Sequence, residues 1–266
     1  HCHVPIDLRM NPIVKNEEQL RYEFFKLKTV GVDKITISGG EPTLHKSISP
    51  IIMDAKKQFD QVALITNGFN KDVLEMLVHQ CDVWFSIDFW SVRHDEWRRL
   101  KGLWKNYLEL KSEVNVRSTL MSYNLEDLKK LIPYVVKNER EITIVPYKGK
   151  GKLEPSARQM RELFSFIIRN KYMKYVYIDD PCIKMFLALH FPDLKKTVLN
   201  WKQTRGRICP ALWEVIGVDI NGNVSICPFD MTPMINIKDL SIEKLEELRK
   251  SFNPPLPDAC IDCPYN

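Results

Sequence analysis

A regular alternation of short apolar runs with longer amphipathic segments limits the possible folds more than any other property of the chain. Apolar runs that fit strands lie at residues 33–38, 62–65, 83–88, 115–120, 142–145 and 175–178. Segments with helical spacing separate or precede them, at residues 17–30, 47–58, 70–79, 95–112, 124–137 and 155–169. Strands that alternate with helices of this length are typical of parallel βαβ units. The sequence therefore predicts an α/β fold built on a parallel sheet.

The number of units predicts a partial barrel with a small appendage. The five strands before residue 150, together with a first strand placed before His1, make six βα units, which would form a partial (β/α)6 parallel barrel over residues 1–170. A full barrel of eight units would need more chain than precedes the second group of cysteines. A bridging segment is expected at 171–204, with a short helix at 181–189, and a Cys-rich α+β appendage at 205–266. In the appendage, apolar residues 215–218 and 223–226 flank Asp-Ile-Asn-Gly, which predicts a β-hairpin, and a helix is predicted at 241–250.

Composition and charge exclude several classes of protein. The 266 residues include 39 Lys and Arg against 34 Asp and Glu, and these charges alternate along helix faces as solvated surface does. No nucleic-acid partner is predicted on this charge. No apolar run approaches the length of about 18 residues that a membrane-spanning helix needs, so no membrane partner is predicted. The first residues do not resemble a signal peptide, and the expected location is the cytoplasm.

The strand at 33–38 runs into an unusual turn, Ser-Gly-Gly-Glu-Pro-Thr-Leu. Adjacent glycines let the backbone approach a ligand closely, because no Cβ stands in the way. Glu41 adds an acceptor at the carboxyl end of a strand, where parallel sheets and barrels gather their ligands. On composition alone the turn is either a ligand site or an ordinary βα connection.

The cysteines form a second group of candidate functional residues. The chain has seven of them, at positions 2, 81, 182, 209, 227, 260 and 263. An odd number without a secretory signal argues against a disulfide framework. Cys209 and Cys227 bracket the predicted hairpin, and Cys260 and Cys263 form Cys-x-x-Cys after the last helix. Two pairs brought together in this way suit tetrahedral ligation of zinc or of an iron–sulfur cluster.

The Gly-Gly-Glu-Pro turn resembles the S-adenosylmethionine (SAM) binding motif of the radical SAM enzymes. The resemblance implies that the methionyl amino group of SAM is received by Gly39, Gly40, Glu41 and Pro42. It also implies that Cys2 is the third cysteine of a Cys-x-x-x-Cys-x-x-Cys motif whose thiolates hold a [4Fe–4S] cluster, with the first two cysteines before His1. The alternative for Cys2 is a terminal thiol without a role.

Other strand ends follow the same family pattern. Thr66 and Asn67 resemble the strand end that often lines the SAM site, and Ser86 and Asp88 resemble the Ser-Leu-Asp of the following strand. Arg117 is a candidate for the methionyl carboxylate, because an arginine can hold a carboxylate through two parallel hydrogen bonds. The structural alternative for each is a polar residue that merely ends a strand.

The four C-terminal cysteines resemble those of the Twitch domain, a shortened form of the SPASM domain that follows many radical SAM barrels. The resemblance implies an auxiliary iron–sulfur cluster, of the [4Fe–4S] type, on Cys209, Cys227, Cys260 and Cys263. Ligation by four protein thiolates favours an electron-transfer or structural role. A full SPASM domain would have further cysteines after Cys263. Cys182, which lies between the two regions, is a candidate hydrogen-atom donor to a substrate radical, and Cys81 fits a small buried hydrophobe.

The family implies a mechanism. The reduced cluster gives one electron to SAM, and the resulting 5′-deoxyadenosyl radical abstracts a hydrogen atom from the substrate. With an auxiliary cluster as electron acceptor, we expect oxidative modification, by dehydrogenation or cross-linking, of a small molecule or a ribosomal peptide. The electron donor would be a protein such as flavodoxin or ferredoxin. Two alternatives are an inactive radical SAM homologue that acts as a scaffold or regulator, and an interaction module that holds zinc through the four C-terminal cysteines.

Overall fold

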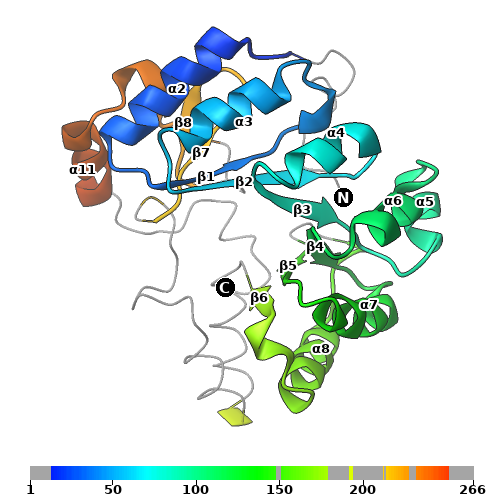
Figure 1. Ribbon diagram of the computed structural model, residues 1–266. Coiled ribbons are helices and arrows are strands. Elements are labelled where there is room, and N and C mark those ends of the chain that lie inside the picture. Colours follow the sequence, from blue (N-terminus) through cyan, green and yellow to red (C-terminus); the bar gives the residue numbers. More distant parts are fainter. Residues whose placement is uncertain are drawn as a thin grey trace. The chain divides into compact units, whose positions relative to one another are not determined.

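The computed structural model describes residues 13–147, 151–178, 192–193, 212, 214–227 and 232–251 (Figure 1). By their contacts these residues form two compact units. The first unit comprises the described residues from 64 to 193, and the second comprises residues 13–63 together with the described residues from 212 to 251. Several residues to which the sequence assigns a role lie outside the described part of the chain: Cys2, Cys182, Cys209, Cys260 and Cys263, as does the predicted helix at 181–189.

Six strands form one sheet, and their order in the sheet is their order along the chain. The strands are β1 (Lys34–Ile37), β2 (Gln61–Thr66), β3 (Asp82–Ser86), β4 (Asn115–Leu120), β5 (Ile142–Pro146) and β6 (Val176–Ile178). The neighbours from β3 to β6 pair in parallel, and a helix lies between each strand and the next along the chain. The predicted α/β fold with a partial parallel barrel is therefore confirmed.

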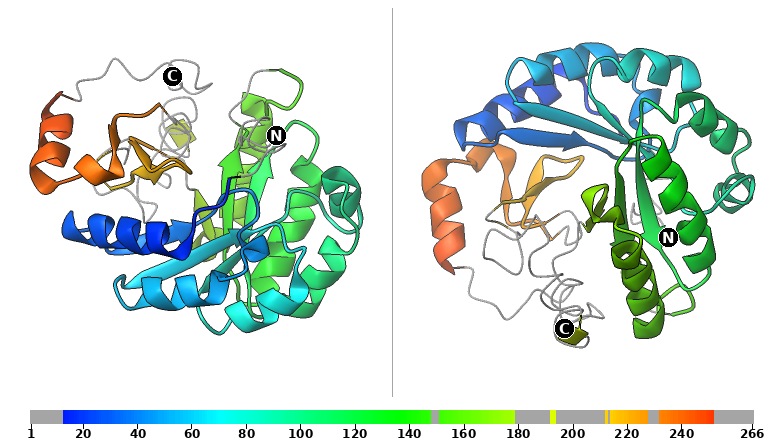
Figure 2. Two further views of the ribbon diagram at one scale, coloured as in Figure 1. Left: turned by 90° about the horizontal axis from the view of Figure 1, so that it is seen from above. Right: turned by 60° about the horizontal axis from the view of Figure 1, so that its bottom comes forward.

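The helices follow the predicted alternation, with one correction. They are α2 (Glu17–Thr29), α3 (Ile48–Lys56), α4 (Lys71–Leu77), α5 (Arg93–Arg98), α6 (Leu103–Leu110), α7 (Leu125–Lys137), α8 (Ala157–Arg169) and α11 (Ile242–Ser251). Figure 1 shows α7 and α8 side by side, and Figure 2 shows the same of α2 and α3. Within the described residues, no helix combines the length and the apolar character that crossing a membrane requires.

The prediction of one helix over 95–112 is wrong, because the chain breaks between α5 and α6. Arg99 and Gly102 both take left-handed backbone conformations, with φ of 53° and 87°. The Asp95 carboxylate accepts hydrogen bonds from the backbone N–H of Gly102 at 2.7 Å and of Trp104 at 2.8 Å, and so satisfies the first amides of α6. A glycine at the left-handed position makes this break possible at low conformational cost.

The two faces of the sheet differ in the first unit. Alternate residues of β3 and β4 are buried, including Phe85 and Val116, and α7 packs against β4 through a buried apolar stripe. The residues between them, including Ser86 and Arg117, are half-buried, and they lie on the opposite face because side chains alternate along a strand. Strand pairing therefore leaves a row of polar side chains on the face away from α7.

The second unit contains the predicted hairpin. Strands β7 (Gly217–Val218), β8 (Asn223–Ser225) and β9 (Ile235–Asn236) form an antiparallel sheet, in which Val218 pairs with Val224. The Asp219 carboxylate accepts from the backbone N–H of Asn221 and of Asn223, both at 2.8 Å, and closes the turn. The hairpin and the helix predicted at 241–250 are thus confirmed, whereas β9 and the short turns η1 (Pro42–Leu44), η2 (Tyr172–Lys174) and η3 (Ile237–Asp239) were not predicted.

Candidate functional site

The Gly-Gly turn after β1 presents bare backbone to open space. Gly39 and Gly40 are exposed, and no atom of the described residues lies within 4 Å of a Cβ built on either of them. Gly39 has φ of +142°, a conformation that residues with a side chain rarely adopt. The structure therefore shows the open backbone cradle that the sequence predicts for a ligand site.

Glu41 is held in place by its own turn. Its Oε1 accepts hydrogen bonds from the backbone N–H of Thr43 at 3.1 Å and from Thr43 Oγ1 at 2.6 Å. Pro42 stands at the first position of η1, where its fixed φ favours the turn, and Thr43 is buried beneath it. A carboxylate fixed at the end of a strand is a suitable acceptor for a ligand ammonium group.

The segment before α2 is anchored to this turn and to the hairpin. The His45 ring accepts the Ser47 N–H at Nδ1 (3.1 Å), so its other nitrogen, Nε2, donates to the Lys15 carbonyl at 2.9 Å. Lys15 Nζ in turn donates to Glu23 Oε2 at 2.8 Å and to the Asp219 carbonyl at 2.5 Å. Burial raises the pKa of Glu23, while the Lys15 ammonium opposes that rise. No sequence pattern indicates this arrangement, because Lys15 and Asp219 are far apart in the chain.

In the first unit, Thr66 and Asn67 belong to a rigid turn after β2. Thr66 Oγ1 accepts the Gly68 N–H at 3.0 Å, and Asn67 Oδ1 accepts the Phe69 N–H at 2.8 Å. Gly68 has φ of +83°, and a Cβ at this position would lie 2.0 Å from the ring of Phe85. Only glycine fits there, so the close approach of this turn to β3 fixes the position of Thr66 and Asn67.

The structure brings Ser86 and Arg117 together. They are register partners on the neighbouring strands β3 and β4, and both side chains are half-buried on the same face of the sheet. Thr143 of β5 continues the row beside Arg117. Two of the sequence-predicted SAM contacts are thus adjacent, with Ser86 at the end of β3 and Arg117 within β4.

Asp88 is placed differently from Ser86, because its side chain is directed into the protein. Only 1% of Asp88 is exposed, and its carboxylate accepts from Arg98 Nη2 at 2.7 Å and from the Thr119 backbone N–H at 2.8 Å. Its own N–H faces His94 Nδ1 at 3.3 Å, and its carbonyl accepts from Asn124 Nδ2 at 2.7 Å. The sequence indicated none of these four partners: His94 and Arg98 lie beside or in a predicted helix, Asn124 begins another, and Thr119 lies within a predicted strand.

His94 remains neutral within this network. Burial lowers the pKa of His94 to about 4, and the nearby Asp88 and Asp95 carboxylates only partly oppose that effect. Its Nε2 and the Nε of Arg98 are buried and make no hydrogen bond within the described part of the structure. The network around Asp88 therefore contains two buried nitrogen atoms that no described residue satisfies.

Of the predicted cluster ligands, only Cys227 lies in the described part of the chain. It follows β8 and packs half-buried against the apolar cluster of Leu212, Ile226 and Leu245. Within the described ranges, no three His, Cys, Asp or Glu side chains come close enough together to hold a metal ion. The ligand roles of the cysteines therefore remain predictions from the sequence.

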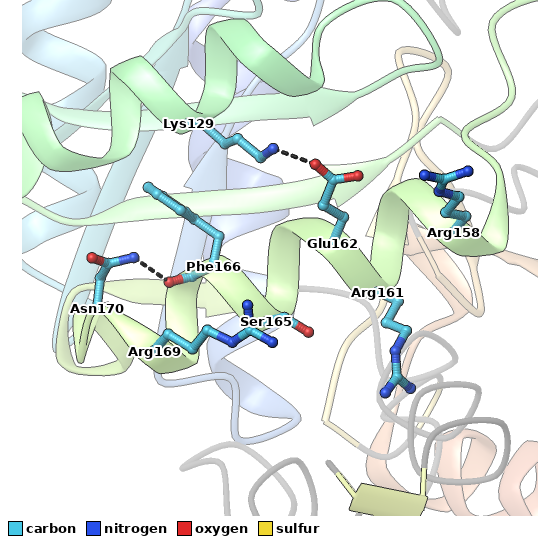
Figure 3. A pocket seen from close by; sticks show the side chains of 8 residues that line it. All are labelled: Lys129, Arg158, Arg161, Glu162, Ser165, Phe166, Arg169 and Asn170. Carbon is cyan, nitrogen blue, oxygen red and sulfur yellow. Dashed lines mark hydrogen bonds and ion pairs between the residues drawn. The ribbon is translucent and has the colours of Figure 1, made fainter.

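A pocket of about 530 Å³ lies along α8, and its lining contains none of the site residues described above (Figure 3). It is lined by Lys129, Arg158, Arg161, Glu162, Ser165, Phe166, Arg169 and Asn170. Lys129 forms an ion pair with Glu162, and Arg161 forms one with Asp193 at 2.8 Å. None of the predicted site residues lines it, and its paired charges are typical of a solvated surface.

A comparison with family models gives the family, and a comparison with curated proteins gives one relative. A family model described as the radical SAM superfamily matches residues 1–142. The sporulation killing factor maturation protein SkfB of Bacillus subtilis (strain 168) is 35% identical over 98 residues, which are 34% of this chain and 24% of SkfB.

Two crystal structures of Streptococcus suis SuiB share the fold. SuiB bound to S-adenosylmethionine has a TM-score of 0.66 at 15% identity, covering 94% of this chain and 64% of SuiB. SuiB bound to the precursor peptide SuiA has a TM-score of 0.65 at 15% identity, covering 95% of this chain and 64% of SuiB. The chain thus spans about a quarter of SkfB and somewhat less than two thirds of SuiB.

Proposed function

The chain belongs to the radical SAM superfamily, and we propose that it is an enzyme that cleaves S-adenosylmethionine reductively to modify a ribosomal peptide. Membership of this family implies a [4Fe–4S] cluster and SAM as cofactors. When bound, these cofactors supply a 5′-deoxyadenosyl radical that abstracts hydrogen from the substrate. The single observation that carries the proposal is the open Gly39–Gly40 backbone, followed directly by a carboxylate held in its own turn.

The chain's own residues bind and orient SAM in this proposal. Glu41 accepts a hydrogen bond from the methionyl ammonium group, and the bare backbone of Gly39 and Gly40 leaves room for it. Arg117 donates to the methionyl carboxylate, and Ser86, its partner on the adjacent strand, adds a hydroxyl on the same face. Cys2 is proposed as one of three cluster ligands, with the other two before His1.

The substrate is proposed from the relatives. SkfB is named as a maturation protein of a killing factor, and SuiB has been crystallised with a precursor peptide. We propose by analogy that a ribosomal peptide is oxidised, by dehydrogenation or by cross-linking. An auxiliary cluster, bound by residues 205–266, would accept the electron from the substrate radical, and a flavodoxin or ferredoxin would supply electrons in the cytoplasm.

The structure of the hairpin is compatible with an auxiliary cluster bound beside it. Cys227 follows β8 directly, and Asp219 and Gly222 hold the hairpin closed between the predicted ligands Cys209 and Cys227. In this proposal the hairpin would supply one of the four ligands, Cys227, from the residue that follows Ile226 after β8. The other three ligands, Cys209, Cys260 and Cys263, are assigned from their spacing in the sequence.

Iron and sulfide analysis with EPR of the anaerobically purified full-length protein tests this proposal. We expect about eight irons per chain, which fall to about four when the four C-terminal cysteines are changed to Ala, and a remaining signal that SAM perturbs. Cys81→Ser is the matched control, because Cys81 is not a predicted ligand, and its iron content should equal that of the wild type. Zinc in place of iron, or a cluster that does not respond to SAM, would contradict the proposal.

A further inference from the structure

The loops that follow β3 and β4 are joined by one buried polar network with Asp88 at its centre. One carboxylate oxygen of Asp88 accepts from the backbone N–H of Thr119 in β4, and the other accepts from Arg98 in α5. Asn124 bridges the same two loops, because its Nδ2 donates both to the Asp88 carbonyl at 2.7 Å and to the Thr119 carbonyl at 2.8 Å. Asp88 and Asn124 thus extend the pairing of β3 and β4 beyond the end of β3.

Further hydrogen bonds reach the backbone of the two residues that are proposed to bind SAM, Ser86 and Arg117. The Ile87 N–H donates to the Arg117 carbonyl at 2.9 Å, and the Ser118 hydroxyl donates to the Ile87 carbonyl. Arg98 Nη2 also approaches the Ser86 carbonyl at 3.5 Å. The backbone at Ser86, Ile87 and Arg117 is therefore bonded to Arg98 or to the adjacent strand, and Asp88 holds the Thr119 N–H two residues beyond Arg117.

A network of this kind is not required for stability alone. Replacing a buried ion pair by apolar residues of similar volume is often neutral or stabilising, because both charges lose their hydration when they are buried. A fully bonded carboxylate does, however, fix the geometry of every group that donates to it. The side chain of Asp88, with 1% exposure, is also too deeply buried to be a direct ligand contact.

We propose that Asp88 and Arg98 are positioning residues of the SAM site, which fix the backbone at the end of β3 and along β4 so that Ser86 and Arg117 present their side chains at one spacing on one face. This inference rests on the proposed function, because it requires SAM to bind there. In this inference Asp88 affects SAM binding indirectly, by holding the backbone near Ser86 and Arg117. Arg98 has the same role, which the sequence did not indicate.

The same region offers a matched control pair. Asp127 is also buried, and its carboxylate accepts from Arg93 Nη1 at 2.6 Å and from the Trp90 backbone N–H at 3.1 Å. This pair ties the same loop to α7, but it bonds to neither Ser86, Arg117 nor Thr119 in any contact of the described structure. Asp127→Asn therefore disturbs a buried carboxylate and its solvent-exposed arginine partner, and it removes no hydrogen bond of Ser86, Arg117 or Thr119.

The test measures SAM affinity by isothermal titration of the full-length protein with its cluster intact, and the thermal midpoint of the same samples. We expect Asp88→Asn and Arg98→Met each to weaken SAM binding at least tenfold, with unchanged iron content. The double variant should bind no more weakly than the weaker single variant, because both changes remove one pair. Asp127→Asn should lower the midpoint, yet keep SAM affinity within about twofold of the wild type.

The outcomes are distinguishable. SAM binding by Asp88→Asn and Arg98→Met equal to that of the wild type, at a lowered midpoint, would overturn the inference and leave the network a structural one. Failure of both variants to fold, with Asp127→Asn folded, would overturn it in the same way. A wild-type protein that holds its cluster but does not bind SAM would instead overturn the proposed function.

Discussion

The turn after β1 and the loop after β3 are both strand ends with a carboxylate, but they are built in opposite ways. At Gly39 and Gly40 no atom of the described residues lies within 4 Å of an added Cβ, and Glu41 is held by the neighbouring Thr43. At Asp88 the carboxylate is buried, and it is held by residues from β4 and α5. The first arrangement leaves room for a ligand, and the second leaves none.

Polar residues that share a motif can therefore be separated into those that bind a ligand and those that support the site. A substitution at an open strand end is expected to change ligand affinity strongly and the free energy of unfolding little. A substitution at a closed strand end is expected to lower the free energy of unfolding. Substitutions at four positions test this contrast, and they are ordered by the size of their expected effect on stability.

The largest effect is expected at Gly68, in the closed part of the first unit. Gly68→Ala places a Cβ 2.0 Å from the buried ring of Phe85 at a φ of +83°, so we expect a loss of about 3 to 4 kcal/mol in the free energy of unfolding. Gly102→Ala is the control, because its φ is +87° but its Cβ would meet open space, and it should cost about 1 kcal/mol. If denaturant melts gave the same loss of unfolding free energy for both variants, the steric role of Phe85 at Gly68 would be contradicted.

The next effect is a pH dependence of stability through His94. Burial lowers the pKa of His94 to about 4, below the ordinary value of about 6.5, so the unfolded chain binds a proton that the folded chain does not. The contribution of neutral His94 to the free energy of unfolding is fully present above a pH of about 6.5. It decreases as the pH drops towards 4, by about 3 kcal/mol at most. The difference between the wild type and His94→Gln in urea melts across this range should show that slope. A parallel pH profile for the two proteins would show that His94 does not titrate in this way.

A smaller effect is expected at Lys15 of the second unit, whose carbonyl bonds to the His45 ring after the open turn. Lys15 and Glu23 form an ion pair at 2.7 Å with side chains that are each only 11% exposed. Lys15→Met leaves the Glu23 carboxylate buried without its cation, and we expect a loss of about 2 kcal/mol in thermal or denaturant unfolding. The double variant with Glu23→Gln should recover part of that loss. No recovery would show that Lys15 acts through its bond to the Asp219 carbonyl instead.

The smallest effect on stability is expected at Gly40, which is the strongest test of the open turn. Gly40→Ala should change the free energy of unfolding by about 0.5 kcal/mol or less, because the new methyl group meets no described atom. SAM affinity should fall at least tenfold, since that methyl group takes up space that the ligand needs. Unchanged SAM affinity, measured by titration calorimetry, would remove the turn from the binding site.

The sequence was most informative where the pattern is local. The strand–helix alternation predicted the sheet, and Gly39 to Pro42 predicted the open turn, because both depend on neighbouring residues. The break at Gly102 was missed, since it depends on the Asp95 side chain several residues earlier. The buried direction of Asp88 was also missed, because its partners Arg98, Thr119 and Asn124 come together only in the folded sheet.

Reductive cleavage of SAM by the full-length protein is the most direct test of the proposed enzyme and its open turn. The anaerobic protein with its cluster is reduced with dithionite in the presence of SAM, and 5′-deoxyadenosine is measured by chromatography. We predict that the wild type forms 5′-deoxyadenosine, and that Glu41→Gln forms it at least tenfold more slowly with unchanged iron content and stability. A wild-type protein with a complete cluster that forms none, or a Glu41→Gln variant as fast as the wild type, would contradict this prediction.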